Sequence, residues 1–415
     1  MSGSVISAAV VERQPRYAWV VMAILWGIDL MATMVFFSVG ILLPIWKADL
    51  GVSPVQAGLL GSAGFLGFGL MALPASIWLT KYNPRWMTLA CALGMALLAV
   101  LQSFSPTVEL LLIGRLAFVL LMVSRLQVQV MFLQQWFQPR LYSTINSLDF
   151  SARSVGQVLA LAATPPLILL LGNWRHFYLA VAIGLVAFSL VWALGGRERQ
   201  RPARANVPRS AVGNPAGVLR RHKVLWLMAA SQMGEAAAFA CFISFFPTYA
   251  IDRLGISLTT IGLIMSLFPA GQILGSLLAG PLSQAIGLRK PFIWVPGLIL
   301  PVMYTALLHT DQVPVLILLL LVTGALAFAV GPVLFTMPLD MGLNPREVAI
   351  AFGLMRTLFP LGATVGPIFV GLMYQATGSL LLGLSIVAPL PITYFLCGVF
   401  LPETGPKGRR HSSQE

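Results

Sequence analysis

Long apolar stretches of about 20 residues follow one another along the whole chain, separated by short polar segments. A helix needs roughly 20 mainly apolar residues to cross the hydrocarbon core of a bilayer. Only 9% of the 415 residues are charged, compared with about 25% in a typical soluble domain. The sequence therefore excludes an ordinary soluble enzyme and predicts an all-α membrane protein that crosses the bilayer many times.

Twelve spanning helices are predicted, in two groups of six. The first group is expected at about 17–44, 55–79, 86–104, 109–135, 142–171 and 176–195. The second group is expected at about 224–250, 258–283, 290–308, 314–338, 348–374 and 379–401. Residues 1–196 and 224–415 are thus two predicted six-helix bundles, and residues 197–223 are a basic, flexible linker. The first apolar run is too long for a signal peptide, so we expect it to be retained as a helix.

A net charge of +13 raises nucleic acid as a partner, but the placement of the basic residues has a simpler explanation. With the N-terminus inside, nineteen basic residues fall in inside loops, and only Lys47, Arg175 and Arg253 fall in outside loops. An excess of Lys and Arg in short loops marks the cytoplasmic side. Both termini and the linker are therefore predicted to be cytoplasmic, with no nucleic acid partner. Contact of the linker with anionic lipid is a lesser alternative.

An internal repeat relates the two groups of helices. Shifting the chain by 204 residues aligns a gap-free series of identical residues over a loop, a helix and the next loop. The aligned pairs include Gly58 with Gly262, Ser62 with Ser266, and Arg85 with Arg289. Two six-helix halves of parallel topology are the expected consequence.

The loop after the second helix of each half resembles the major facilitator superfamily pattern G-x-x-x-D-[RK]-x-G-[RK]-[RK]. The first copy consists of Ser76, Thr80, Lys81, Asn83 and Arg85, and the second of Gly280, Gln284, Gly287, Arg289 and Lys290. Both copies lack the acidic residue. Further similarities to the family are Gly172-Asn173-Trp174-Arg175 before the sixth predicted helix and the glycines Gly353, Gly362 and Gly366 of the eleventh.

This resemblance implies a fold of twelve helices in two pseudo-symmetric bundles around a central cavity. It also implies secondary active transport by alternating access, and a gating role for Lys81, Arg85 and Arg289. Arg115 resembles the fourth-helix arginine that the family links to proton coupling, and a structural role is the alternative for it.

Charged residues inside the predicted helices are the strongest functional signal, because each costs about 2.5 to 3.5 kcal/mol at a helix centre on insertion scales. They are Asp29, Arg115, Arg125, Asp149, Arg153, Glu235 and Arg356. Such residues normally pair with one another or line a cavity. From the helical rise of about 1.5 Å per residue, Asp29, Arg153 and Glu235 are expected near the midplane.

Asp29 and Glu235 occupy near-equivalent places in the first helix of each half, so we predict that they couple transport to protons. Helical spacing places the predicted substrate-binding residues on nearby faces. They are Trp26, Arg125, Gln129, Asn146, Arg153, Gln157, Gln232 and Arg356. Of these, Arg153 is the predicted anchor for an anionic group, either alone or together with Arg356, because a planar guanidinium binds a carboxylate through two parallel hydrogen bonds.

Several pairings remain open at this point. Arg125 with Asp149 could form a clasp between helices or a gate, and Asp149 with Arg153 could be a local pair. Tyr304 is expected to serve in packing or as an interfacial anchor. Asp340 is expected in a surface network with two loop residues, Arg346 and Glu347.

The sequence thus predicts a monomeric secondary transporter of the inner or plasma membrane. Four intramembrane arginines against three acids favour a small organic anion, moved together with a proton. Proton-coupled efflux of amphipathic or cationic compounds is the alternative, and a membrane receptor or scaffold that does not transport is a third hypothesis. We expect no enzyme activity, metal or cofactor, because the chain shows no nucleotide-binding loop motif and its Cys and His residues are scattered.

The predicted topology can be tested by cysteine labelling. A cysteine introduced at Arg204 or Lys407 should react with a membrane-impermeant maleimide only from the cytoplasmic side, and one at Asp311 only from outside. Labelling of intact cells and of inverted vesicles measures this, with the chain that lacks the new cysteine as the control. The reverse pattern would overturn the helix assignment.

Overall fold

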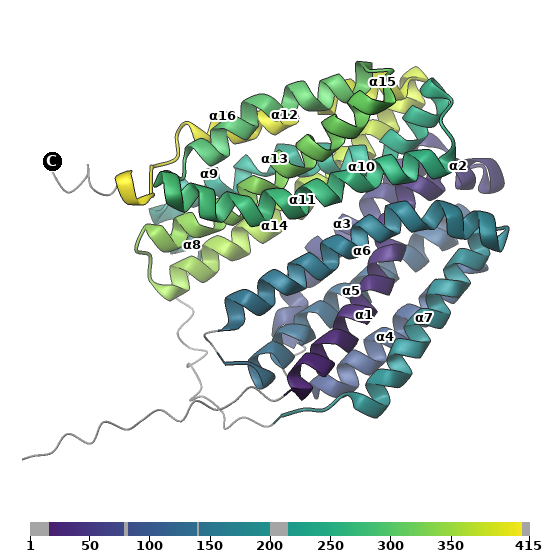
Figure 1. Cartoon of the computed structure of the whole chain (residues 1–415), viewed down its shortest axis with the longest axis horizontal. Helices are drawn as coiled ribbons and strands as arrows, with labels where there is room; N and C mark the ends of the chain where they lie inside the picture. Colours follow the sequence, from purple (N-terminus) through teal and green to yellow (C-terminus); the bar gives the residue numbers. More distant parts are fainter. Residues whose placement is uncertain (1–15, 79–81, 139–140, 200–214, 409–415) are drawn as a thin grey trace, which may run out of the picture.

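The computed structural model describes residues 16–78, 82–138, 141–199 and 215–408. Within these ranges, twelve helical stretches are long and apolar enough to cross a membrane. The predicted all-α membrane class is therefore confirmed. Figure 1 shows the helices in two bundles, one from each half of the chain.

The helices of the first half are α1 (Tyr17–Phe37), α2 (Val39–Leu50), α3 (Pro54–Trp78), α4 (Pro84–Ser103), α5 (Val108–Trp136), α6 (Tyr142–Leu171) and α7 (Trp174–Gly195). The second half begins with α8 (Pro215–Arg221), α9 (Val224–Ser231), α10 (Met233–Leu254), α11 (Leu258–Ile286) and α12 (Pro291–His309). It continues with α13 (Val313–Asp340), α14 (Pro345–Thr377), α15 (Leu380–Val387), the 3-10 turn η4 (Leu390–Ile392) and α16 (Thr393–Gly398).

Three predicted helices are interrupted in the structure. The first is divided at Ser38, whose hydroxyl donates to the Val35 carbonyl at 3.2 Å, and its second segment runs on to Leu50. The seventh is divided at Gln232. The twelfth is divided around Pro389 and Pro391, because proline cannot donate a backbone hydrogen bond.

Part of the expected flexible linker is helical. Residues Pro215–Arg221 form α8, and His222 beyond it lies 3.3 Å from the Glu347 carboxylate of α14. Residues 200–214 lie outside the described part of the chain. The end of the molecule that carries α8 and the loops with Arg85 and Arg289 is called the basic end below, and the other end is the opposite end.

The two halves pack closely towards the opposite end. Gly58, near the start of α3, lies against Pro367 and Ile368 of α14. Its repeat mate Gly262, near the start of α11, lies against Leu161 and Pro165 of α6. A side chain on either glycine would meet the facing backbone, so the small residues allow this approach. The repeat detected in the sequence therefore appears in three dimensions as two matching contacts between the halves.

Two hydrogen bonds also join the halves in this region. The Ser62 hydroxyl of α3 donates to the Thr364 carbonyl of α14 at 2.6 Å, and Lys47 Nζ of α2 lies 3.1 Å from the Tyr374 hydroxyl. The side chain of Arg356, nearer the basic end of α14, is exposed. In this conformation the two halves are in contact at the opposite end, and a charged side chain is exposed nearer the basic end.

Candidate functional site

Asp29 of α1 and Arg125 of α5 form an ion pair inside the first half, with side chains only 1% and 0% exposed. Of the partners that the sequence left open for Arg125, the structure favours neither a clasp nor a gate with Asp149, because Asp29 of α1 supplies the acid that neutralises Arg125. Removing one partner of such a buried pair leaves an uncompensated charge and is strongly destabilising. This pair thus fixes α1 against α5.

Asp149 of α6 collects hydrogen-bond donors from three helices. Arg153 Nη2, one helical turn away, donates to Oδ2 at 2.6 Å. Trp26 Nε1 of α1 donates to Oδ1 at 3.1 Å, and the Gln129 amide of α5 donates to the same oxygen. The local pair of Asp149 with Arg153, left open by the sequence, is thus present in the structure. It is partly accessible, because the two side chains are 13% and 32% exposed.

Arg356 of α14 faces this cluster from the second half. It lies near enough to Arg153 for the two guanidinium groups to repel one another. Among the residues that the structure describes, no carboxylate pairs with Arg356. Arg153 and Arg356 each lie eleven residues after the first residue of their helix, Tyr142 or Pro345. The pseudo-symmetry therefore places two arginines at equivalent depths, about 16 Å from the basic ends of their helices.

Several buried polar atoms in the first half lack a partner in the described part of the chain. They are Asp29 Oδ2, Arg125 Nε and Nη1, Gln129 Oε1 and Gln157 Oε1. Buried polar groups are normally hydrogen-bonded. The interior of the first half thus has hydrogen-bonding capacity beyond what its own side chains use. The side chain of Asn146, predicted on the same stripe, lies outside the described residues.

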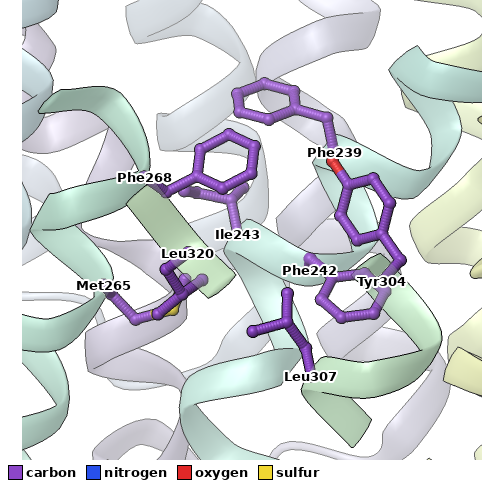
Figure 2. Close-up of a pocket in the computed structure, with 8 residues that line it drawn as sticks. All are labelled: Phe239, Phe242, Ile243, Met265, Phe268, Tyr304, Leu307 and Leu320. Atoms are coloured by element: carbon purple, nitrogen blue, oxygen red, sulfur yellow. The ribbon is translucent and has the colours of Figure 1, made fainter. Parts of the chain in front are cut away.

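Glu235 of α10 is buried in the second half. The Tyr304 hydroxyl of α12 donates to Glu235 Oε1 at 2.8 Å, so Tyr304 is more than the packing residue that we expected. Because α12 packs against α13 and α16 within its own half, this carboxyl points into the bundle. Figure 2 shows Tyr304 among Phe239, Phe242 and other apolar side chains, packed too tightly to admit a water molecule.

The break between α9 and α10 connects this region to Arg356. Gln232, the residue at the break, donates from Nε2 to the backbone carbonyl of Met355 at 2.9 Å. Gln232 therefore holds the segment of α14 that carries Arg356, and its own side chain is buried rather than exposed between the halves.

Arg115 of α5 acts as a structural clamp. It donates to the carbonyls of Leu60 at 2.9 Å, Val35 at 3.1 Å and Phe36 at 2.7 Å, and it is 2% exposed. The last two carbonyls belong to the C-terminal turn of α1, where a cation is favoured. These contacts match the structural alternative for Arg115, since they join α5 to α1 and α3.

The arginine of the second loop motif is held by an acid from elsewhere in the chain. Arg289 Nε lies 3.1 Å from Asp340 Oδ2 at the end of α13, and Arg289 Nη2 donates to Gln284 at 2.8 Å. The expected surface network of Asp340 with loop residues is corrected to include this ion pair. Asp340 supplies the carboxylate that the motif itself lacks, and Gln284 occupies the place of the missing acid.

Sequence reasoning missed two glutamates that hold both loop motifs. Glu198, just after α7, accepts from the backbone N–H of Arg85 at 2.8 Å. Glu403, after α16, accepts from the backbone N–H of Arg289 at 2.8 Å. Their near-equivalent positions in the two repeats were the available signal. Of the predicted gating residues, Arg85 also donates to the Ala193 carbonyl at 2.7 Å, and Lys81 lies outside the described residues.

Comparison with known proteins adds the family context. A family model described as Major Facilitator Superfamily matches residues 25–259 and 228–415. The human MFS-type transporter SLC18B1 is 28% identical over 49% of this chain and 47% of its own length, so this match spans about half of that relative. The chloramphenicol resistance protein of Streptomyces lividans is 29% identical over 81% of this chain and 84% of its own. The probable sulfoacetate transporter SauU of Cupriavidus necator is 21% identical over 82% of this chain and 84% of its own length.

Among solved structures, a bacterial homolog to the human lysosomal transporter Spinster, in an inward-facing and unoccupied conformation, superposes with a TM-score of 0.77. The two sequences are 17% identical, and the superposition covers 93% of this chain and 98% of the homolog's chain, which shows a shared fold. Because the family model matches well over half of the chain, the protein belongs to the Major Facilitator Superfamily.

The buried ion pair leads to a stability prediction. Asp29→Asn should lower the free energy of unfolding by about 3 to 5 kcal/mol, because Arg125 then remains buried without its counter-charge. The double variant Asp29→Leu with Arg125→Met should recover most of this loss. Thermal unfolding in detergent measures both. Equal stability of Asp29→Asn and the unaltered protein would contradict the pairing.

Proposed function

We propose that this member of the Major Facilitator Superfamily is a secondary active transporter that moves a small organic anion by alternating access, with a proton as the coupling ion. The observation that carries the proposal is the pair of arginines from opposite halves, Arg153 and Arg356, which lie at equivalent depths of their helices and are both accessible. A ligand bound between two guanidinium groups contacts both halves at once. This is the requirement for a site at the interface of two repeats.

The chemistry of this site favours an anion. A guanidinium presents a fixed fork of donors that matches a carboxylate or another oxyanion through parallel hydrogen bonds. Arg153 uses Nη2 to hold Asp149, and Arg356 has no acid partner among the described side chains. Trp26, Gln129, Asn146 and Gln157 are the residues that we propose around the bound ligand. The resemblance to a probable sulfoacetate transporter supports an organic anion.

The orientation in the membrane is part of the proposal. The excess of basic residues in the loops of one side favours a cytoplasmic basic end, with both termini inside and the protein in the plasma membrane. In that orientation the conformation described here is open to the cytoplasm, with the contacts of Gly58 and Gly262 closing the outer side. Arg85 and Arg289, held at the basic end, are then proposed to act when the cytoplasmic side closes.

Proton coupling is assigned to buried carboxyls. Asp29 and Glu235 are the proposed carriers, since each is an acid expected near the midplane in the first spanning segment of its half. Their surroundings differ, because Asp29 has a cationic partner, whereas the one hydrogen-bond partner of Glu235 among the described side chains is the Tyr304 hydroxyl. An isolated carboxylate in a dry apolar site is costly, whereas a neutral carboxyl is not. Arg115 is proposed to support proton coupling by holding α1 in place rather than by exchanging a proton itself.

An alternative function has one specific observation in its favour. The Streptomyces lividans relative, similar over most of both chains, is a chloramphenicol resistance protein. Efflux of such an amphipathic compound predicts that expression of this protein raises the chloramphenicol concentration that cells tolerate. The anion proposal predicts unchanged tolerance, together with stabilisation of the purified protein by organic anions in a thermal-shift screen.

The role of Arg153 can be separated from that of a structural pair. Arg153→Lys retains the charge but loses the planar fork, so anion affinity should fall by about 10- to 100-fold, the equivalent of one charge-assisted hydrogen bond. Binding by thermal shift and flux in proteoliposomes measure this. If Arg153 merely neutralises Asp149, the double variant Asp149→Asn with Arg153→Gln should restore flux relative to either single variant. Flux near that of the unaltered protein in the double variant would exclude Arg153 as the anchor.

The role of Glu235 can be tested with a substitution that preserves its hydrogen bond. Glu235→Gln still accepts from Tyr304 but cannot exchange a proton. We expect anion exchange to remain while accumulation driven by a pH gradient is lost. Tyr304→Phe, which removes the donor and keeps the carboxyl, serves as the matched control. Unchanged pH-driven accumulation in Glu235→Gln would remove this residue from the coupling mechanism.

A further inference from the structure

The intramembrane charges of this protein divide into a sealed group and an open group. In the sealed group, Arg125 is neutralised by Asp29, Arg115 is held by three carbonyls and Glu235 is held by Tyr304. All of these side chains are at most 2% exposed.

The open group consists of Asp149, Arg153 and Arg356, whose side chains are partly accessible or exposed. Two cations and one anion leave a net charge of +1 in this group. The pseudo-symmetry explains the imbalance, because the arginine occurs in both halves at the same depth. The acid one turn before it occurs only in the first half, and Phe352 stands at the corresponding place in α14.

Closing the basic end would move Arg356 and Arg153 out of contact with water while they still repel one another. A charge enclosed without its counter-charge is strongly unfavourable in a protein interior. The conformation described here avoids this cost, because Arg356 stays exposed while the opposite end is closed.

We infer that the two halves close over this site only when its net charge has been brought to zero, by a singly charged anion alone or by a doubly charged anion together with one proton. This inference rests on the proposed function, and it deepens that function by relating the valence of the substrate to the number of protons that bind at this site. It adds that the unloaded carrier changes conformation slowly, so exchange of one anion for another is faster than net transport.

The geometry of Asp149 offers a place for this additional proton, which is separate from the coupling proton proposed for Asp29 or Glu235. The groups that face it are Trp26 and Asp29 from α1, Gln129 from α5, and Arg153 from its own helix. Trp26 and Gln129 both donate to Oδ1, whereas Arg153 donates to Oδ2. A bound dianion that takes over Arg153 frees Oδ2 alone. A proton from solution can then bind at Oδ2 while Oδ1 keeps both of its donors.

The exchange arm uses the full-length protein in liposomes loaded with labelled methanesulfonate, a monoanion, with the membrane potential clamped at zero. External unlabelled methanesulfonate should accelerate release by about tenfold or more. The carrier then returns with a bound anion and does not need to close while its site is empty and charged. Arg356→Gln makes the open group neutral, so this acceleration should disappear. Arg356→Lys, which keeps the charge, should retain the acceleration even if affinity falls. Arg356 makes no ion pair among the described residues, and gel filtration of each variant verifies folding.

The proton arm compares methanesulfonate with sulfoacetate, a dianion, using a pH-sensitive dye inside the liposomes. Sulfoacetate uptake should carry one proton more per anion than methanesulfonate uptake. Asp149→Asn raises the open group to +2, so sulfoacetate should then enter without this additional proton. Flux without acceleration, or equal proton numbers for the two anions in the unaltered protein, would overturn this inference alone. Absence of flux for both anions would overturn the proposed function and this inference with it.

Discussion

The cost of an uncompensated charge in a low-dielectric interior governs the arrangement of this protein. The pair of Asp29 with Arg125 is the central example, because both side chains are almost completely buried and each is tolerated only in the presence of the other. Pairing them sets the rotation of α1 relative to α5. That rotation directs Trp26, one turn before Asp29, to the carboxylate of Asp149 on α6. One buried ion pair thereby positions the accessible part of the candidate site.

Small residues determine where the halves can approach. Because Gly58 and Gly262 have no side chains, the helix backbones come into contact at two pseudo-symmetric crossings, α3 with α14 and α11 with α6. Larger residues there would separate the helices, and Ser62 would lose the Thr364 carbonyl. The basic end is organised differently. There Glu198 and Glu403 hold the loops of Arg85 and Arg289 within each half by capping backbone N–H groups. The halves are thus stiff units that meet through small residues.

The fold could be predicted because helix length and polarity in a bilayer are local properties of the chain. The interruptions at Ser38 and Gln232 were missed because the apolar runs continue through them, and only a tertiary contact such as Gln232 with the Met355 carbonyl stabilises the break. The charged residues of the site could also be found, since each is costly in an apolar stretch. Their partners could not. Spacing along one helix predicts Arg153 with Asp149, but Arg125 has acids on two neighbouring helices within its reach. Helix rotation, which is a property of the packed bundle, selects Asp29.

The position of Gln232 has a mechanical consequence for the second half. Its side chain holds the Met355 carbonyl, which precedes Arg356 directly, and its backbone precedes the first turn of α10, which contains Glu235. If α14 moves at Arg356, the hydrogen bond from Gln232 to Met355 should therefore pull on the start of α10, where Glu235 follows Gln232 by three residues. The side chain of Glu235 is 2% exposed and is bonded to Tyr304 of α12, so the carboxyl reaches solvent only if α10 or α12 moves. Arg356, which has no acid partner among the described residues, and the buried carboxyl of Glu235 are thus connected through the residue at which the seventh predicted helix is divided.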